Sequence, residues 1–142
     1  MRLSSLADYA VITMCEAARQ CGTLQRLSPN GVRRGRTSAA VLAERAGLPV
    51  PTVQKIVSRL TAAGLLRSVR GAGGGLQLAR PPAAITLAEI VEAVEGPIVL
   101  QPLADAASGE PRRPHLAIIN TALRGALAGI SLDQLARTRE LA

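Results

Sequence analysis

The stretch SAAVLAERAGLPVPTVQKIVSRLTAAGLLRSVRGAGGGLQLAR, Ser38–Arg80, predicts two short helices separated by a tight turn and followed by a hairpin with a glycine-rich tip. Ser38 suits the N-cap of the first helix, because its hydroxyl can accept a hydrogen bond from a free backbone N–H. Gly47 follows that helix, where a left-handed backbone favours a residue without a Cβ. Pro49 and Pro51 prevent the helix from continuing, and Pro51 suits the first turn of a second one. This order of elements is a helix-turn-helix followed by a wing.

The second helix has one apolar and one polar side. Its apolar residues are spaced at i, i+3, i+4 and i+7, so they form one stripe facing a core: Val53, Ile56, Val57 and Leu60. The opposite side offers only amides, hydroxyls and cations, which bind base edges in a major groove and flanking phosphates. We therefore expect this helix to contact DNA through Pro51, Thr52, Gln54, Lys55, Ser58 and Arg59.

The wing is expected to consist of strands over Leu65–Arg70 and Leu76–Arg80. The tip between them carries almost no side chains, so it can approach another backbone closely. We expect Arg70 to enter a minor groove, and the predicted DNA contacts of the wing are Arg70, Gly71, Gly73 and Gly74. The alternative is that this helix and hairpin are ordinary polar surface of a soluble protein.

The charge of the chain is concentrated in the winged segment. Residues 33–80 hold eight arginines and one lysine against one acid, a local charge of +8, whereas the net charge of all 142 residues is +7. Such an asymmetry indicates a polyanionic partner, for which double-stranded DNA is our first choice. The alternatives are a basic RNA-binding protein and a partner-binding module without operator recognition. Tyr9 is the only aromatic residue, so single-strand binding by base stacking has no platform.

The C-terminal part contains two further predicted helices. Ile85–Glu95 is a short one, and Pro81 and Pro82 before it mark the expected boundary between a winged-helix DNA-binding domain, 1–82, and a linker with a dimerisation helix, 83–142. His115–Ile130 is the longer one. Its apolar residues repeat as a heptad seam: Leu116, Ile119, Leu123, Ala126 and Ile130. We expect this seam to form a homodimer, because helix-turn-helix proteins read two-fold operators. Burial against the same chain is the alternative.

The N-terminal part is expected to be a central helix, Met1–Gln20, with Ser5 and Asp8 as a capping box. The segment 22–37 is expected to be a loop with a turn at Asn30-Gly31. Its arginines, Arg33, Arg34 and Arg36, are either a solvated cluster or an extra phosphate contact. The overall fold class is therefore mainly α with a small β-hairpin: a winged helix-turn-helix plus a long dimerisation helix.

Composition also limits the compartment and the chemistry. No apolar run is long enough to span a membrane, and no signal peptide is recognisable, so we expect a cytoplasmic protein. The two cysteines, Cys15 and Cys21, are expected to be reduced and structural. With a single histidine, the chain shows no catalytic triad by spacing, and GAGGG lacks the lysine of a phosphate-binding loop. We therefore do not expect an enzyme.

Three segments resemble the Rrf2 family of bacterial transcription regulators, the group of IscR and NsrR: LSSLADYAV, VSRLTAAGLLRSVRGAGGG and ITLAEIVEAVEGP. The likeness covers residues 1–99 and resumes over 116–132, and within the family it is greatest to regulators of SUF iron–sulfur assembly genes. The resemblance implies a homodimeric winged helix. It also implies that Gln54 stands at the base-reading position and Arg70 at the position of the wing arginine.

The chain departs from that family in two places. The segment 22–37 is longer than usual, and residues 97–115, which should supply the sensory cysteines, contain none. Family members often carry a 2Fe–2S or 4Fe–4S cluster, which thiolates hold. Asp8 matches a further ligand of some members, but it and His115 cannot replace the missing thiolates. We therefore expect no metal site and no cofactor, and DNA binding that does not depend on oxygen or iron.

Overall fold

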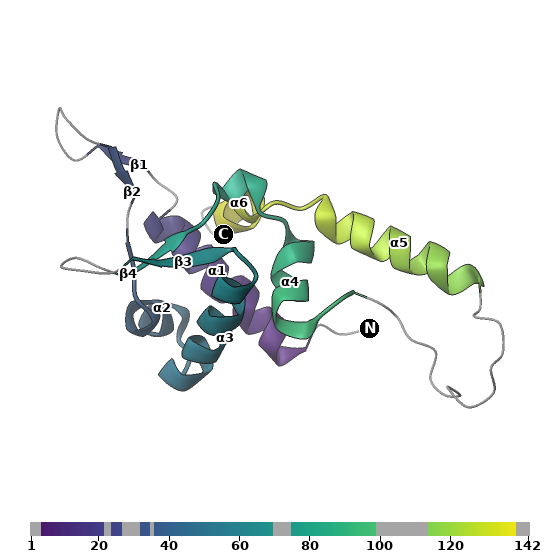
Figure 1. Cartoon of the computed structure of the whole chain (residues 1–142), viewed down its shortest axis with the longest axis horizontal. Helices are drawn as coiled ribbons and strands as arrows, with labels where there is room; N and C mark the ends of the chain where they lie inside the picture. The colour runs from purple at the N-terminus through teal and green to yellow at the C-terminus, as the bar shows by residue number, and fades with distance from the viewer. Residues whose placement is uncertain are drawn as a thin grey trace.

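In the computed structural model, the described residues are 4–21, 24–26, 32–34, 36–69, 75–98 and 114–138. The elements are, in chain order, α1 (Ser5–Cys21), β1 (Leu24–Arg26), β2 (Val32–Arg34), α2 (Ala39–Ala46), α3 (Val50–Ala62), β3 (Leu66–Val69), β4 (Gly75–Leu78), the 3-10 turn η1 (Pro82–Ala84), α4 (Leu87–Glu95), α5 (Pro114–Ala128) and α6 (Leu132–Thr138). The described part is mainly helical with short antiparallel hairpins, which confirms the predicted fold class (Figure 1).

Helix α1 is the centre of the molecule and contacts α2, α3, α4 and α6. Its N-cap differs from the prediction, because Ser4 rather than Ser5 accepts the hydrogen bond from the backbone N–H of Ala7 at 3.1 Å. The predicted capping box of Ser5 and Asp8 is therefore wrong. The small residues Ala7, Ala10 and Ala17 are fully buried and allow neighbouring helices to approach closely.

The core is aliphatic. Its largest fully buried side chains come from nearly every part of the described fold: Met14, Leu42, Val53, Ile56, Leu60, Leu65, Leu66, Leu78, Ile85, Ile90 and Leu132. They belong to one hydrophobic cluster, with members on both sides of residue 82. The structure thus joins α4 and α6 to the winged helix by packing. The division of the chain into 1–82 and 83–142 stays a prediction about function.

The helix-turn-helix begins and ends where local chemistry requires. Ser38 accepts a hydrogen bond from the backbone N–H of Val41 at 3.2 Å and caps α2. Gly47 has φ of 69°, the left-handed conformation that ends a helix. Pro49 caps α3, and Pro51 lies in its first turn, where a missing N–H costs no hydrogen bond. These predicted helix ends are confirmed.

The wing strands pair with each other and with the segment before α2. β3 and β4 are antiparallel, with Leu66 opposite Leu78 and Val69 opposite Gly75. Thr37 then pairs with Leu76 through two backbone hydrogen bonds of 3.0 and 2.7 Å. At Gly75 a Cβ would lie 2.5 Å from the carbonyl oxygen of Thr37, so a larger residue cannot be accommodated without a shift. Glycine is needed here for close backbone approach.

A second hairpin precedes the helix-turn-helix. β1 and β2 are antiparallel, with Leu24 opposite Arg34 and Arg26 opposite Val32. The prediction of a loop throughout 22–37 is therefore wrong for these residues. The predicted turn at Asn30-Gly31 lies outside the described residues. Three-residue strands are too short to show a convincing alternation in the sequence, which is why only the turn signal was visible.

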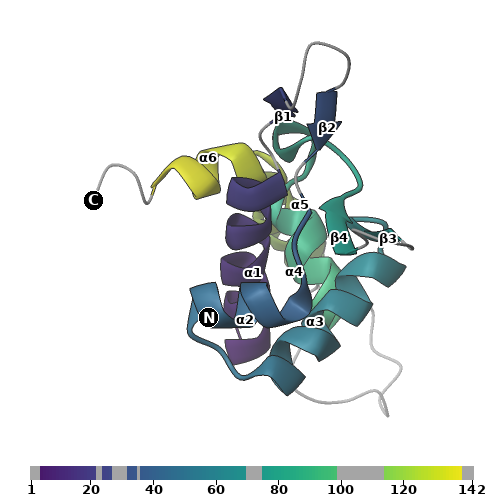
Figure 2. The same ribbon diagram turned by 90° about the vertical axis from the view of Figure 1, so that its left-hand side faces the viewer.

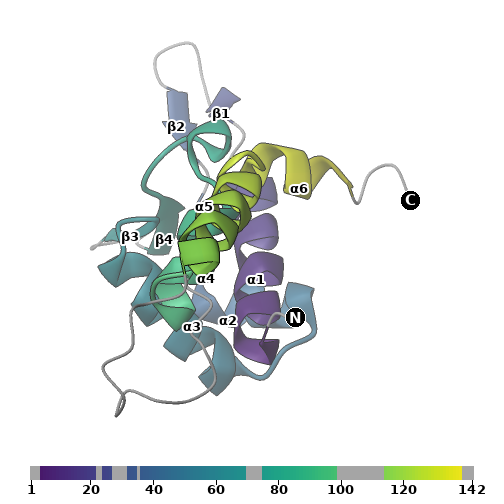
Figure 3. The ribbon, with the colours of Figure 1, turned by 90° about the vertical axis from the view of Figure 1, so that its right-hand side faces the viewer.

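The C-terminal helices return to the central helix. Thr86 and Glu89 form the capping box of α4. After α5, the N–H of Leu132 bonds to the carbonyl of Ile85 at 2.8 Å, and the N–H of Leu87 to the carbonyl of Ile130 at 2.9 Å. These bonds dock α6 beside α1, whereas α5 lies along α4 (Figure 3).

Candidate nucleic-acid interface

The outer side of α3 is polar because its inner side supplies the core. Val53, Ile56 and Leu60 are fully buried, which turns the opposite side of the helix to solvent. No acidic residue lies in the first turn of α3, and no side chain caps it. Its free N–H groups and the positive end of its dipole thus favour an anion. α3, β1–β2 and the wing strands lie on the side of the molecule that faces the viewer in Figure 2.

Most of the α3 residues predicted to contact bases or phosphates are accessible. Pro51, Gln54, Lys55 and Ser58 are exposed, and Thr52 is half-buried. An amide, an ammonium group and a hydroxyl thus stand on one exposed side of the helix. This arrangement is suited to a duplex groove, since these groups donate to and accept from base edges and phosphate oxygens.

Arg59 does not share this outward placement. It is half-buried, and its guanidinium donates a hydrogen bond to the backbone carbonyl of Val94 in the last turn of α4. The expectation that Arg59 points outward with its neighbours is therefore wrong. A cation at a helix C-terminus stabilises the unpaired carbonyls there. Arg59 thus joins α3 to α4, while its predicted contact with DNA stays a prediction.

The base of the wing is held by side chains as well as by the strand ladder. Arg67 donates two hydrogen bonds, of 3.2 and 2.9 Å, to the side-chain carbonyl of the buried Gln77 on the opposite strand. Together with the Thr37–Leu76 pairing, this fixes the direction in which the wing leaves the body. The predicted wing contacts lie outside the described residues: Arg70, Gly71, Gly73 and Gly74.

An ion pair ties the exit of the wing to α4. Arg80 donates to a carboxylate oxygen of Glu89 at 2.8 Å, and Glu89 also accepts from the N–H of Thr86 at 2.9 Å. Partial burial opposes ionisation of Glu89, but the hydrogen bonds from Thr86 and Arg80 outweigh it and lower the pKa of its carboxyl. The Glu89 carboxylate is therefore ionised at neutral pH, where it accepts hydrogen bonds from both Thr86 and Arg80.

The long helix α5 leaves large apolar side chains in solvent. Ile118 is 72% exposed and Ile119 40% exposed, while Leu116 and Leu123 are half-buried. α4 is its neighbour on one side, where Arg124 pairs with Glu92 at 2.9 Å. Ile118 was not part of the predicted seam, although its place beside Ile119 could have indicated a wider apolar surface. Within the described residues, the side of α5 that carries Ile118 and Ile119 has no partner.

The C-terminal end of the predicted seam differs in the structure. The helix predicted over His115–Ile130 ends at Ala128, and Ile130 packs partly against the core of its own chain together with Leu127. The placement of Ile130 on one helical seam with Leu116, Ile119, Leu123 and Ala126 is therefore wrong. Gly129 directly follows the last helical residue, and glycine is a poor helix former.

Both cysteines lie in packed parts of the fold. Cys15 and Cys21 are both buried, and burial raises the pKa of both thiols. The Cys21 thiol donates to the carbonyl of Leu76 at 3.6 Å. Asp8 and His115 are exposed, each at the beginning of a different helix. Within the described ranges, no three His, Cys, Asp or Glu residues form a group that could hold a metal ion.

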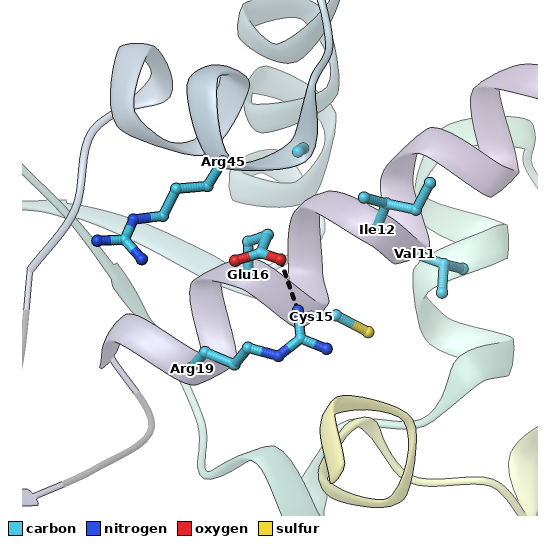
Figure 4. Close-up of a pocket in the computed structure, with 7 residues that line it drawn as sticks. Val11, Ile12, Cys15, Glu16, Arg19 and Arg45 are labelled. Carbon is cyan, nitrogen blue, oxygen red and sulfur yellow. Dashed lines mark hydrogen bonds and ion pairs between the residues drawn. The ribbon is translucent and has the colours of Figure 1, made fainter. Parts of the chain in front are cut away.

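A half-open cavity of about 350 Å³ lies between α1 and the end of α2. Figure 4 shows Cys15 in its wall and the ion pair between Arg19 and Glu16, whose nearest atoms are 2.6 Å apart. Arg19 also donates to the carbonyl of Ala136 in α6. The pair therefore has a structural function: it joins the central helix to the C-terminal one. Within the described residues, no helix is long and apolar enough to cross a membrane.

Sequence comparison shows that this chain is similar to transcriptional regulators. The Rrf2 family profile, described as an iron-dependent transcriptional regulator, matches residues 3–138. The chain is 33% identical over 137 residues to the HTH-type transcriptional regulator CymR of Bacillus subtilis, covering 96% of this chain and 90% of that one. It is 36% identical over 95 residues to IscR of Cereibacter sphaeroides, covering 67% of this chain but only 56% of that relative.

Solved structures agree with the sequence matches. The structure of CymR, the global cysteine regulator of B. subtilis, superposes with a TM-score of 0.73 at 31% identity, covering 97% of this chain and 98% of that one. The structure of T. potens IscR has a TM-score of 0.70 at 27% identity, covering 98% and 88%. The two sequence relatives, CymR of B. subtilis and IscR of C. sphaeroides, are named as HTH-type transcriptional regulators.

Proposed function

This chain belongs to the Rrf2 family and is a DNA-binding transcription regulator of the winged helix-turn-helix class, and we propose that it binds a two-fold operator as a homodimer without an iron–sulfur cluster. The observation that carries the proposal is the exposed polar side of α3, opposite a fully buried apolar stripe. We also propose a cytoplasmic location, because a regulator of this class acts on chromosomal DNA.

In the proposed complex, the N-terminal half of α3 enters the major groove. Gln54 can make a bidentate pair with the edge of an adenine, and Lys55 and Ser58 bind flanking groups. The free N–H groups at the beginning of α3, near the exposed Val50 and Pro51, favour a backbone phosphate. Thr52 completes the proposed contacts on this helix, and Arg59 supports them by joining α3 to the carbonyl of Val94.

The wing is proposed to enter the adjacent minor groove. Arg70 supplies the charge that a narrow minor groove attracts, and Gly71, Gly73 and Gly74 allow close approach of the backbone. Support comes from the rigid base of the wing, where Arg67, Gln77 and the Thr37–Leu76 pairing fix its origin.

A second copy of the chain is the proposed partner of α5. Ile118 and Ile119 of α5 are exposed to solvent. Covering them would stabilise the protein by about 25 cal/mol for each Å² of apolar surface removed from water. Leu116, Leu123 and Ala126 extend the same helix surface. A second copy also gives two recognition helices, as a two-fold operator requires.

We also propose that the protein binds no iron–sulfur cluster. The family description includes iron dependence, yet the donor set of this chain does not fit a cluster, because both thiols are buried and lie on packed elements. DNA binding is then constitutive or controlled by another ligand. Anaerobic reconstitution with iron and sulfide, followed by visible absorption and iron assay, tests this: about two irons per dimer, lost on Cys15→Ala or Cys21→Ala, would refute it.

The DNA-binding proposal is tested by selecting operators from random duplexes and measuring affinity for the selected site. Gln54→Ala should cost roughly 1–3 kcal/mol on the selected site and little on scrambled DNA. Arg137→Ala, an exposed change on α6 outside the proposed interface, is the control and should change neither affinity. Equal affinity of the unchanged protein for duplex DNA and RNA would favour a general basic RNA-binding protein instead. Catalysis is not expected, since its relatives are regulators.

A further inference from the structure

We infer that the β1–β2 hairpin is a second DNA-contacting arm, which binds the phosphate backbone outside the segment read by α3 and the wing. The inference rests on the proposed function, and it decides between the two alternatives that the sequence left open for the arginines of this segment: a solvated cluster or an extra phosphate contact. The hairpin is inserted between the central helix and the helix-turn-helix, over Leu24–Arg26 and Val32–Arg34.

The first argument is its position. β2 ends at Arg34, and three residues later Thr37 is hydrogen-bonded in both directions to Leu76 of the wing. Three residues span at most about 10 Å, so the end of the hairpin is tethered close to the base of the wing. Figures 1 and 2 agree that the hairpin lies on the side of the molecule that carries α2, α3 and the wing strands, away from α5.

The second argument is the order of α3, the wing strands and the hairpin along that side. The wing strands lie between α3 and the β1–β2 hairpin (Figures 1 and 2). With α3 in a major groove and the wing in the next minor groove, this order puts the hairpin beyond the wing along the duplex. The partner there is the sugar–phosphate backbone of flanking DNA.

The third argument is its charge. The two strands carry Arg26, Arg33 and Arg34, and residues 22–37 contain no acidic residue. A surface that is only solvated normally mixes both signs of charge, because neighbouring like charges repel each other. Duplex DNA presents about one phosphate per 1.7 Å of helix axis, so cations on a hairpin find partners there without an exact pattern. An acidic protein would have to match the hairpin in shape as well.

The test is a charge-removal variant, Arg26→Gln with Arg33→Gln and Arg34→Gln, in the full-length protein. The control is Arg112→Gln with Arg113→Gln and Arg137→Gln, which removes the same net charge outside the winged segment. Affinity for the selected operator is measured from 50 to 200 mM salt. One duplex ends at the operator edges, and a second carries about ten further base pairs on each side, the length of one helical turn.

The unchanged protein should bind the longer duplex more tightly, and the hairpin variant should lose this preference. Its salt slope should fall by about 1 for each phosphate that the dimer of the variant no longer neutralises. The control variant should keep the preference for the longer duplex. Lysine at the three positions should restore most of the slope, because lysine also binds phosphate, which a role in folding alone would not explain.

A hairpin variant with the salt slope and the flank preference of the unchanged protein would overturn the inference, and would leave operator recognition by α3 intact. Failure of the unchanged protein to bind any selected duplex would instead remove the proposed function together with this inference. Equal loss in the hairpin and control variants would also overturn it, since net charge rather than position would then explain the effect.

Discussion

Replacing Arg59 with alanine is expected to weaken DNA binding by loosening the attachment of α3, not by removing a phosphate contact. The guanidinium of Arg59 donates to the carbonyl of Val94, which lies at the end of α4, and this bond joins residues 35 positions apart. The variant leaves that carbonyl without its charged partner. It also removes a cation from the negative end of the α4 dipole.

The magnitude follows from the partial burial of the pair. A hydrogen bond to a charged group contributes roughly 1.5–3 kcal/mol. Arg59 is half-buried, and water can replace the guanidinium at the carbonyl, so we expect a loss of ~1–2 kcal/mol in the free energy of unfolding. For a chain of this size, such a loss lowers Tm by roughly 3–8 °C.

Two measurements separate the two roles of Arg59. Thermal or urea unfolding reports the loss of the hydrogen bond to Val94, and the dependence of operator affinity on salt reports the number of phosphates bound. Lys55→Ala is the matched control, because Lys55 is an exposed cation on the same helix and should lower the salt slope by about 1 per protomer without changing Tm. Arg59→Ala with unchanged stability and a slope lowered by about 1 per protomer would refute the reasoning and restore Arg59 as a phosphate ligand.

Three further predictions concern the wing, the dimer and acid stability. Gly75→Ala should lower both Tm and operator affinity, because its Cβ would lie 2.5 Å from the carbonyl oxygen of Thr37 and disturb the base of the wing; unchanged values for both would contradict this close approach. Leu123→Glu should give a folded monomer by light scattering and circular dichroism, because Leu123 is half-buried in the single chain and on the proposed interface; a dimer of unchanged strength would place the interface elsewhere. Glu89 has a lowered pKa in the folded chain, so its stabilising contribution is present at neutral pH and is lost as the pH falls below its ordinary value of 4.5. Glu89→Gln should therefore reduce the loss of urea resistance between pH 7 and pH 3.5, and an identical pH dependence in the two proteins would count against the assignment.

Much of the helix-turn-helix was determined by residues close together in the chain. Ser38, Gly47 and the two prolines around Val50 define the ends of α2 and α3, and each acts on a backbone group within a few residues. The capping box of Thr86 and Glu89 is equally local. The periodicity of α3 identified its exposed side, because burial of one stripe requires exposure of the other.

Only the tertiary structure decided which partners distant residues meet. Arg59 has the charge and spacing of a DNA contact, yet its guanidinium meets the end of a helix that follows much later in the chain. Ile130 continues a heptad in the sequence, yet the pairing of its backbone with Leu87 turns it to the core of its own chain. The β1–β2 hairpin is too short to produce a periodic signal. A helix cap or an amphipathic stripe is encoded within a few residues, whereas these three outcomes depend on the positions of elements that become neighbours only when the chain has folded.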